Sequence, residues 1–217
     1  MSVAVYPKKV IRNFGNYGIV ITIQKMFMNF IKPFFNYVVY RFYLINLNAI
    51  PFKSIERKDF QFKFLSSDDT QLIEQIEQME EWLENLLQKR LKAGSICLVV
   101  LKGPHVVGFN LVSFGKIYIP LVEQWRTFDK NEAWSEQITV HKNYRRRGLA
   151  SDIRYRIFNE LKSMGISYFY GAALRNNYGS LSLACKVGFK LIYDLHFVKF
   201  LGIKNWSIKR LTEKNVR

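Results

Sequence analysis

A short basic turn around one glycine is the part of this sequence whose residue types point most directly to chemistry. The pattern Arg-x-x-Gly-x-Ala is formed by Arg145, Arg146, Arg147, Gly148, Leu149 and Ala150, and Ser151 follows it. It lies between a strand-like run ending at Val140 and a helix-like run ending near Met164. Glycine lets the backbone approach a ligand closely, and successive N–H groups with a following helix N-terminus attract anions. The turn is therefore a candidate diphosphate site, although basic runs also occur as solvated surface or nucleic-acid patches.

A second motif follows about thirty residues downstream and strengthens the first of these interpretations. It has the spacing Asn-x-x-Ser-x-x-Leu-x-x-Lys-x-Gly-Phe and consists of Asn177, Ser180, Leu183, Lys186, Gly188 and Phe189. Together, in this order and separation, the two motifs resemble the GNAT superfamily of acyl-CoA-dependent N-acetyltransferases. The resemblance extends from about Phe60 to Leu211.

The resemblance implies a binding site for acetyl-CoA as the acyl donor. Backbone amides near Ile138 to Val140 would line the acetyl group and the pantetheine arm, and the turn from Arg145 to Ser151 would hold the diphosphate. Asn177 would contact the pantetheine or support the site, and it is equally suited to cap a helix. The implied CoA-binding residues are Ile138, Thr139, Val140, Arg145, Arg146, Arg147, Gly148, Leu149, Ala150, Ser151 and Asn177.

Acetyl transfer also needs a group that accepts a proton from the amine. Glu136, nine residues before Arg145, matches the region where many GNAT enzymes carry a catalytic glutamate, and its alternative role is that of a solvated strand carboxylate. Three acids in the preceding loop are further candidates: Glu123, Asp129 and Glu132.

One position departs from the family pattern. Many relatives have a tyrosine after the leucine of the second motif, where its hydroxyl protonates the CoA sulfur, and this chain has Ala184 there. Tyr178 and Tyr193 are substitutes that do not occupy the family position. The departure keeps a second interpretation open, in which the chain is a catalytically weak acyl-CoA-binding module recruited to a membrane or protein partner.

Composition limits the class of protein. The 217 residues are 49% hydrophobic, which is enough for a packed core, and the net charge of +16 favours anionic partners. Two cysteines, Cys97 and Cys185, form neither a disulfide framework nor a metal-ligand spacing, and three histidines are scattered. No metal is therefore expected, and a reducing cytoplasm fits. Nucleic-acid binding is the least supported function, because the basic residues form no recognition motif beyond the turn at Arg145.

The first 58 residues differ from the rest, with nine basic residues against one acid, Glu56. No uncharged run between Ile19 and Ile50 reaches the ~18–20 residues of a membrane span. On a helical projection one face carries Phe27, Ile31, Phe35, Val38, Phe42 and Ile45, which predicts an amphipathic helix kinked at Pro33. Two interpretations stay open: the segment packs on the following domain or forms a homodimer interface, or it lies on an anionic membrane surface. The second would place the protein at the inner face of a membrane.

From Phe60 onward strands and helices alternate. Strands are expected at residues 60–64, 95–102, 106–114, 133–140, 167–173, 189–201 and 203–211, and an irregular stretch at 116–131. Helices are expected from a cap at Ser67 or Asp68 to a stop at Gly94, at 148–164 and at 178–187. This order predicts an α/β (α+β) fold with a mixed sheet covered by helices. The resemblance adds that the sheet splays at its centre, between residues 133–140 and 167–173. The expected divisions are an N-terminal amphipathic segment at 1–58, an acyltransferase domain at 59–213 and a tail at 214–217.

The functional prediction is an acetyl-CoA-dependent N-acyltransferase that moves the acetyl group directly to an amine. The acceptor would be a small molecule or a peptide, and its identity is not indicated by the sequence.

Overall fold

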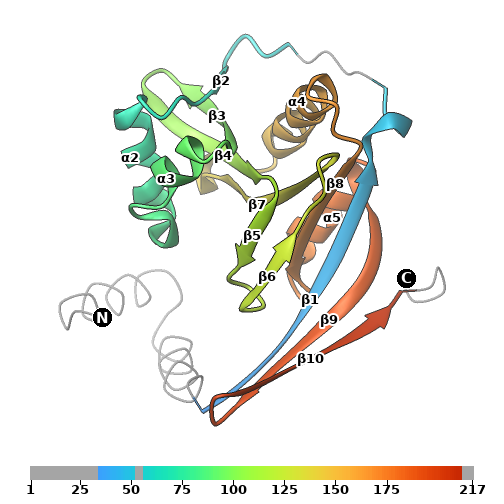
Figure 1. Ribbon diagram of the computed structural model, residues 1–217. Helices are drawn as coiled ribbons and strands as arrows, with labels where there is room; N and C mark the ends of the chain where they lie inside the picture. The colour runs from blue at the N-terminus through green and yellow to red at the C-terminus, as the bar shows by residue number, and fades with distance from the viewer. Residues whose placement is uncertain (1–33, 52–55, 212–217) are drawn as a thin grey trace, which may run out of the picture. The chain divides into compact units, whose positions relative to one another are not determined.

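The computed structural model describes residues 34–51 and 56–211 (Figure 1). The strands are β1 (Phe35–Asn46), β2 (Gln61–Phe64), β3 (Ile96–Lys102), β4 (His105–Ser113), β5 (Lys116–Ile119), β6 (Gln124–Thr127), β7 (Glu132–Val140), β8 (Tyr168–Leu174), β9 (Lys190–Phe200) and β10 (Ile203–Arg210). The α-helices are α2 (Thr70–Met79), α3 (Leu87–Lys92), α4 (Leu149–Ser163) and α5 (Tyr178–Lys186), with short 3-10 turns η1 (Leu47–Ala49), η2 (Glu81–Leu83) and η3 (Lys142–Tyr144).

Eight of these strands form one sheet in the order β10-β9-β1-β8-β7-β4-β3-β2, and β5 pairs with β6 separately. The pairs β1–β8, β2–β3, β3–β4 and β4–β7 are antiparallel, whereas β7 and β8 are parallel. The predicted mixed sheet with flanking helices is confirmed.

The chain divides into two compact units. The larger contains residues 40–194 and continues after residue 208, and the smaller includes residues 195–208 together with the start of β1. Within the smaller unit the rings of Phe197 and Trp206 stack at 5.7 Å, and the Tyr37 hydroxyl lies 2.8 Å from Nδ1 of His196.

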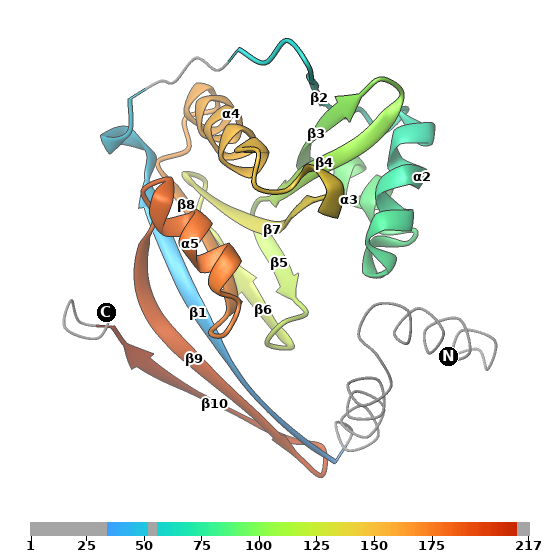
Figure 2. The same ribbon diagram turned by 180° about the vertical axis from the view of Figure 1, so that it is seen from behind.

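Two hydrophobic cores cover the two faces of the sheet in the larger unit. Successive side chains of β3 point into one core and then the other. Cys97, Val99 and Leu101 pack in a core with Ile73 and Ile76 of α2. Leu98 and Val100 belong to the other core, which contains the buried residues of α4 and α5. Figures 1 and 2 show α2 and α3 on one face and α4 and α5 on the other. Period-two alternation with both faces buried is what a sheet between two helical layers requires.

The helix expected across the N-terminal segment is wrong where the structure describes it. Residues Phe35–Asn46 form strand β1, which pairs with β8 from Tyr40↔Leu174 to Asn46↔Tyr168. Eight of the twelve residues of this run are aromatic or β-branched, so it satisfies a strand pattern as well as a helical one, and pairing with β8 decides between them. The expected helical positions before Phe34 lie outside the described residues, and the boundary at residue 58 stays a prediction. In the described ranges no helix is long and apolar enough to cross a membrane.

Two further elements differ from the expected pattern. The single helix expected between a cap at Ser67 or Asp68 and a stop at Gly94 is divided into α2, η2 and α3, with Asn85 at a left-handed φ of 58°. The stretch at 116–131, expected to be irregular, contains the β5–β6 hairpin with Lys116 opposite Thr127. Local patterns miss both because the division of the helix and the hairpin register depend on packing against the sheet.

The sheet splays between β7 and β8, as the family resemblance implied. The two strands pair only from Glu132↔Tyr168 to Trp134↔Tyr170. Beyond this point β7 stays with β4, and β8 stays with β1. A wedge-shaped gap therefore opens in the middle of the sheet.

Tyr43 of β1 packs against β8 where the gap begins. A Cβ atom at Gly171 would lie 2.4 Å from Cε2 of the Tyr43 ring, so only glycine leaves room for that ring. The Tyr43 side chain is buried and its ring meets Phe189 edge to face at 5.0 Å between centroids.

We expect Gly171→Ala to lower the free energy of unfolding by about 1–3 kcal/mol, because the new methyl group overlaps the Tyr43 ring. Denaturant unfolding measures this change. Gly179→Ala is the matched control, since its Cβ would meet nothing closer than 3.9 Å and alanine favours a helix by up to ~1 kcal/mol. Equal stability of Gly171→Ala and wild type would contradict the packing described.

Candidate functional site

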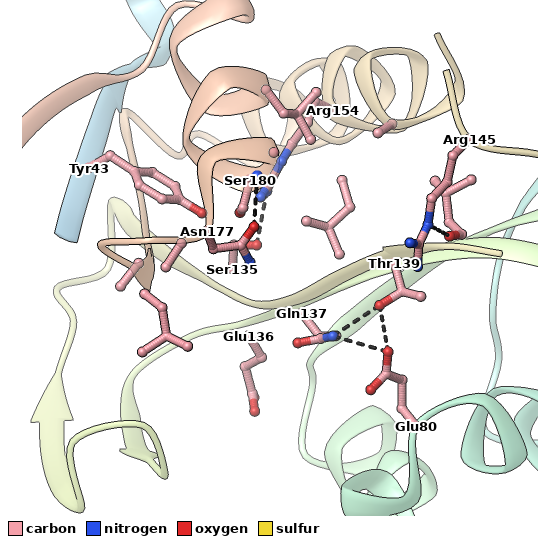
Figure 3. Close-up of a pocket in the computed structure, with 18 of the residues that line it drawn as sticks. Tyr43, Glu80, Ser135, Glu136, Gln137, Thr139, Arg145, Arg154, Asn177 and Ser180 are labelled. Atoms are coloured by element: carbon pink, nitrogen blue, oxygen red, sulfur yellow. Dashed lines mark hydrogen bonds between the residues drawn. The ribbon is translucent and has the colours of Figure 1, made fainter. Parts of the chain in front are cut away.

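A cavity of about 680 Å³ occupies the gap between β7 and β8 (Figure 3). Its walls come from both strands, from α4 and α5, from β1 and from the end of α2. They include Tyr43, Glu80, Leu121, Ser135, Glu136, Gln137, Ile138, Thr139, Val140, Arg145, Arg146, Ala150, Arg154, Ala172, Ala173, Leu174, Asn177, Gly179, Ser180 and Leu183. Residues of both sequence motifs thus face one cavity.

One end of the cavity is the basic turn before α4. Arg146 and Gly148 have left-handed φ angles of 60° and 82°, and Gly148 is the N-cap residue of α4. Gly148 has no side chain to cap the helix, and the amides of Ser151 and Asp152 donate to its carbonyl. The amides of Leu149 and Ala150 are therefore left for an external acceptor. Arg145 is held in place by a 2.9 Å hydrogen bond from its Nε to the Val140 carbonyl. These are the features expected of an anion-binding turn.

A second cavity of about 300 Å³ covers this turn, and the two share Val140, Arg145, Arg146, Ala150, Gly179 and Leu183. Together they bring ten of the eleven residues predicted to bind CoA into one surface. The first is lined by Ile138, Thr139, Val140, Arg145, Arg146, Ala150 and Asn177, and the second adds Gly148, Leu149 and Ser151.

Arg147 lines neither cavity. Its guanidinium lies 5.6 Å from the centre of the Tyr144 ring, and its carbonyl accepts a 2.9 Å hydrogen bond from Nη2 of Arg57. Arg57 also donates from Nε to Oδ2 of Asp152, in the first turn of α4, at 2.8 Å. A Cβ at Gly148 would lie 2.9 Å from Nη2 of Arg57. Arg57 was not a predicted site residue, because its place beside the turn depends on contacts far apart in the sequence.

Asn177 acts as a helix cap at the edge of the cavity. Its Oδ1 accepts a 3.2 Å hydrogen bond from the Ser180 amide at the start of α5. The cap role left open by the sequence is therefore present, and the residue also lines the cavity.

A β-bulge in β7 places Glu136. Leu111 of β4 pairs with Gln137 and Val112 pairs with Ser135, so Glu136 is the extra residue. Simple alternation would direct Glu136 and Gln137 to opposite faces. Instead, Glu136 contacts Arg90 of α3 and Gln137 contacts Glu80 at the end of α2. The bulge thus turns two neighbouring polar side chains toward the same helical layer.

The Glu136 carboxylate is buried and only partly satisfied. Its Oε1 accepts a short hydrogen bond from Ser113, whose hydroxyl oxygen lies 2.7 Å from that of Ser95, and Nε of Arg90 is 3.3 Å away. Its Oε2 is buried with no hydrogen-bond partner in the described part of the chain, and the side chain is 3% exposed. Burial raises the pKa of Glu136, and Ser113 and Arg90 oppose the rise.

Glu80 is a second carboxylate in the cavity wall that the sequence did not single out. Its Oε1 accepts hydrogen bonds from the Thr139 hydroxyl at 2.7 Å and from the Gln137 amide at 3.2 Å. In the sequence Glu80 is one of several acids between residues 74 and 84, and no local pattern distinguishes it from the others. Only the path of β7 past the end of α2 makes it a site residue.

Arg154 lies at the closed end of the gap and is 1% exposed. Its Nη1 donates to Oδ1 of Asn110 at 3.1 Å and to Oγ of Ser135 at 2.9 Å, and both partners are neutral. The guanidinium lies 5.4 Å from the centre of the Phe169 ring. Burial lowers the pKa of Arg154, while the nearby Tyr43 opposes this change. Figure 3 shows Arg154 and Tyr43 on the side of the cavity away from Glu136.

The other residues considered for proton transfer lie elsewhere. Ala184 is buried in the core with α4, Tyr178 is 78% exposed, and the Tyr193 hydroxyl accepts a 2.8 Å hydrogen bond from Arg126. Neither tyrosine lines the cavity, and Tyr43 is the tyrosine that does in the described ranges. The fallback acids Glu123, Asp129 and Glu132 are also absent from the cavity wall of this described part.

The sequence model of the Acetyltransferase (GNAT) family matches residues 54–189. The chain belongs to the GNAT family. Comparison with curated proteins gives no match.

Solved structures of GNAT proteins share the fold. A tandem GNAT protein from the clavulanic acid biosynthesis pathway superposes with a TM-score of 0.55 and 11% identity, covering 81% of this chain and 54% of that one. A GCN5-related N-acetyltransferase from Sphaerobacter thermophilus gives 0.53 and 15%, covering 87% and 56%. A GNAT family protein from Novosphingobium aromaticivorans, described as a putative acetyltransferase, gives 0.52 and 12%, covering 82% and 66%. This chain therefore spans between about half and two thirds of those structures.

We expect Ser113→Ala to raise the pKa of Glu136 further, because the Ser113 hydroxyl donates to the ionised carboxylate and favours that form. Titration of the glutamate carboxyl carbons by NMR measures the shift. Ser163→Ala is the control, since its hydroxyl donates to the Glu160 carbonyl at the far end of α4. A Glu136 pKa that stays the same or falls in Ser113→Ala would rule out this hydrogen bond.

Proposed function

We propose that this GNAT protein transfers an acetyl group from acetyl-CoA directly to the amine of a small molecule or peptide. The observation that carries the proposal is the single cavity that runs from the basic turn at Arg145, through the gap between β7 and β8, to the buried carboxylate of Glu136.

The residues present fit CoA at both ends of this path. At the turn, the uncapped N-terminus of α4 and the side chains of Arg145 and Arg146 offer N–H donors and positive charge to the diphosphate. In the gap, the edges of β7 and β8 that no longer pair with each other offer backbone groups to the amide-bearing pantetheine arm. Ile138 and Val140 lie along that edge.

The bound donor would supply an activated thioester, and the protein's task would be to deliver a neutral amine to it. An ammonium group entering beside Glu136 gives a proton to the carboxylate, either directly or through a water molecule. The freed nitrogen lone pair forms the C–N bond as the C–S bond breaks, and the sulfur leaves as a thiolate. The second proton lost by nitrogen balances the one taken up by the thiolate.

Tyr43 is the candidate proton donor for that thiolate, in place of the tyrosine that Ala184 replaces. Its hydroxyl faces the cavity from β1, beside the Arg154 guanidinium (Figure 3). A thiol pKa near ~8.5 means that a donor helps only modestly at neutral pH, so loss of the usual tyrosine is compatible with activity.

We expect Gly148→Asp to abolish acetyl-CoA binding measured by calorimetry, because it adds a side chain and a negative charge at the helix N-terminus. Gly165→Asp is the matched control: its φ of 78° imposes the same backbone strain as the 82° of Gly148, but it lies beyond the opposite end of α4 with open space around its Cβ. Binding should survive in this variant. A folded wild type that does not bind acetyl-CoA would overturn the proposal.

We expect Glu136→Gln to lower kcat by about 10²-fold or more, because the amide cannot accept the proton. Since burial raises the pKa of Glu136, the carboxylate is lost on acidification at a higher pH than the ~4.3 of an ordinary glutamate. Wild-type kcat/KM should therefore fall as pH drops through the raised pKa, and this fall should be missing in Glu136→Gln.

Glu80→Gln provides the comparison for this experiment, because Glu80 is the other carboxylate in the cavity wall. If Glu80→Gln removes the acid limb and Glu136→Gln keeps it, the base is Glu80. If the wild type binds acetyl-CoA and acetylates none of the amines, the chain is the acyl-CoA-binding module considered above.

A further inference from the structure

A separate pocket of about 270 Å³ opens beside the cavity and shares Glu136, Gln137 and Leu121 with it. Its other walls come from Tyr40, Trp82, Ile119, Pro120 and Trp134. They belong to β1, η2, β5, the β5–β6 turn and β7, so this aromatic pocket does not include the basic turn before α4. It meets the donor cavity at Glu136.

Aromatic and aliphatic side chains form nearly all of the aromatic pocket. Trp134 and Ile119 are buried, Trp82 is 39% exposed at the surface, and burial together with nearby Glu123 raises the pKa of Tyr40, which keeps its hydroxyl neutral. Phe128 stacks on Trp134 and Phe42 packs against it at a tilt, each at 5.7 Å between ring centroids, and these contacts hold the orientation of the indole. The pocket is therefore a preformed apolar recess.

Glu136 is the one charged residue among the described residues that line this pocket. One of its oxygens, Oε1, is already bonded to Ser113 and faces Arg90, whereas Oε2 is buried with no partner in the described ranges. A buried carboxylate oxygen without a donor is costly, and a bound ammonium group would supply both a hydrogen bond and a positive charge. Aromatic rings beside the carboxylate also favour a cation.

From these observations we propose that the acceptor is a monoamine with an apolar or aromatic body, such as an alkylamine or arylalkylamine. This inference rests on the proposed acetyl transfer and narrows its substrate. The amino group lies at Glu136, next to the donor cavity, and the apolar body fills the recess between Trp82, Trp134 and Ile119.

The same pocket disfavours polycationic and sugar-like amines. A molecule with several ammonium groups needs several carboxylates, and the described lining offers Glu136 alone. Sugar hydroxyls placed against Trp134, Ile119 and Pro120 lose their hydrogen bonds to water without replacement.

The test measures kcat/KM for ethanolamine, propylamine, butylamine, hexylamine, phenethylamine and an aminoglycoside, with acetyl-CoA as donor. We expect kcat/KM to rise by about fourfold for each CH₂ group until the pocket is full. Phenethylamine should exceed ethanolamine by about 100-fold or more. Binding of phenethylamine to the protein without donor is measured in parallel by fluorescence titration.

Trp82→Ala should weaken phenethylamine binding by about tenfold or more, because it removes an aromatic wall. Its KM for acetyl-CoA should stay unchanged, since Trp82 does not line the donor cavity. Trp82→Phe should restore most of the binding. The matched control is Trp125→Ala, whose indole is 64% exposed on β6 and lies outside the pocket.

The outcomes separate the inference from the function on which it rests. Preference for the aminoglycoside or ethanolamine, or unaltered amine selectivity in Trp82→Ala, would overturn the inference while leaving the transferase in place. Absence of both acetyl-CoA binding and product formation would overturn the transferase and the inference with it.

Discussion

The structure depends on the early end of the parallel ladder between β7 and β8. After three paired positions the strands separate, and each keeps its other neighbour, so the sheet stays continuous at its margins while its centre opens. An open centre is costly because it removes ladder hydrogen bonds and exposes apolar side chains. Two large side chains reduce that cost: Tyr43 packs on β8 at Gly171, and Arg154 bonds to Ser135 and Asn110 at the closed end. The cavity is thus a built feature of the sheet.

The elements that surround the gap could be predicted from the sequence because their signals are local. Glycine at 148 and 165 marks the ends of α4, Asn177 caps α5, and the strand-like run at 133–140 indicates β7. The two motifs lie on these same elements. Predicting the elements therefore also predicted where most of the proposed CoA-binding residues lie in the fold. A motif and the secondary structure that positions it are read from the same short stretch of chain.

What the sequence did not reveal depends on contacts between distant segments. The aromatic run at 35–46 fits two periodicities, and only its pairing with β8 makes it a strand, so Tyr40 and Tyr43 were not recognised as site residues. Glu80 becomes part of the cavity through Thr139 and Gln137, about sixty residues later in the chain. The bulge at Glu136 is likewise a property of the β4–β7 register. None of these relations leaves a local pattern.

The pairing of Arg57 with Asp152 has a consequence for the charge at the start of α4. An acid in the first turn of a helix is normally stabilising, because its negative charge interacts favourably with the positive end of the helix dipole. At the start of α4, however, this acid would compete with a phosphate group for the amides at the helix N-terminus. Arg57 bonds to that acid at 2.8 Å and lies over Gly148, so the protein's own anion is neutralised from the side. The N-terminus of α4 thereby keeps its stabilising carboxylate and would still present a net positive field to a dianionic ligand.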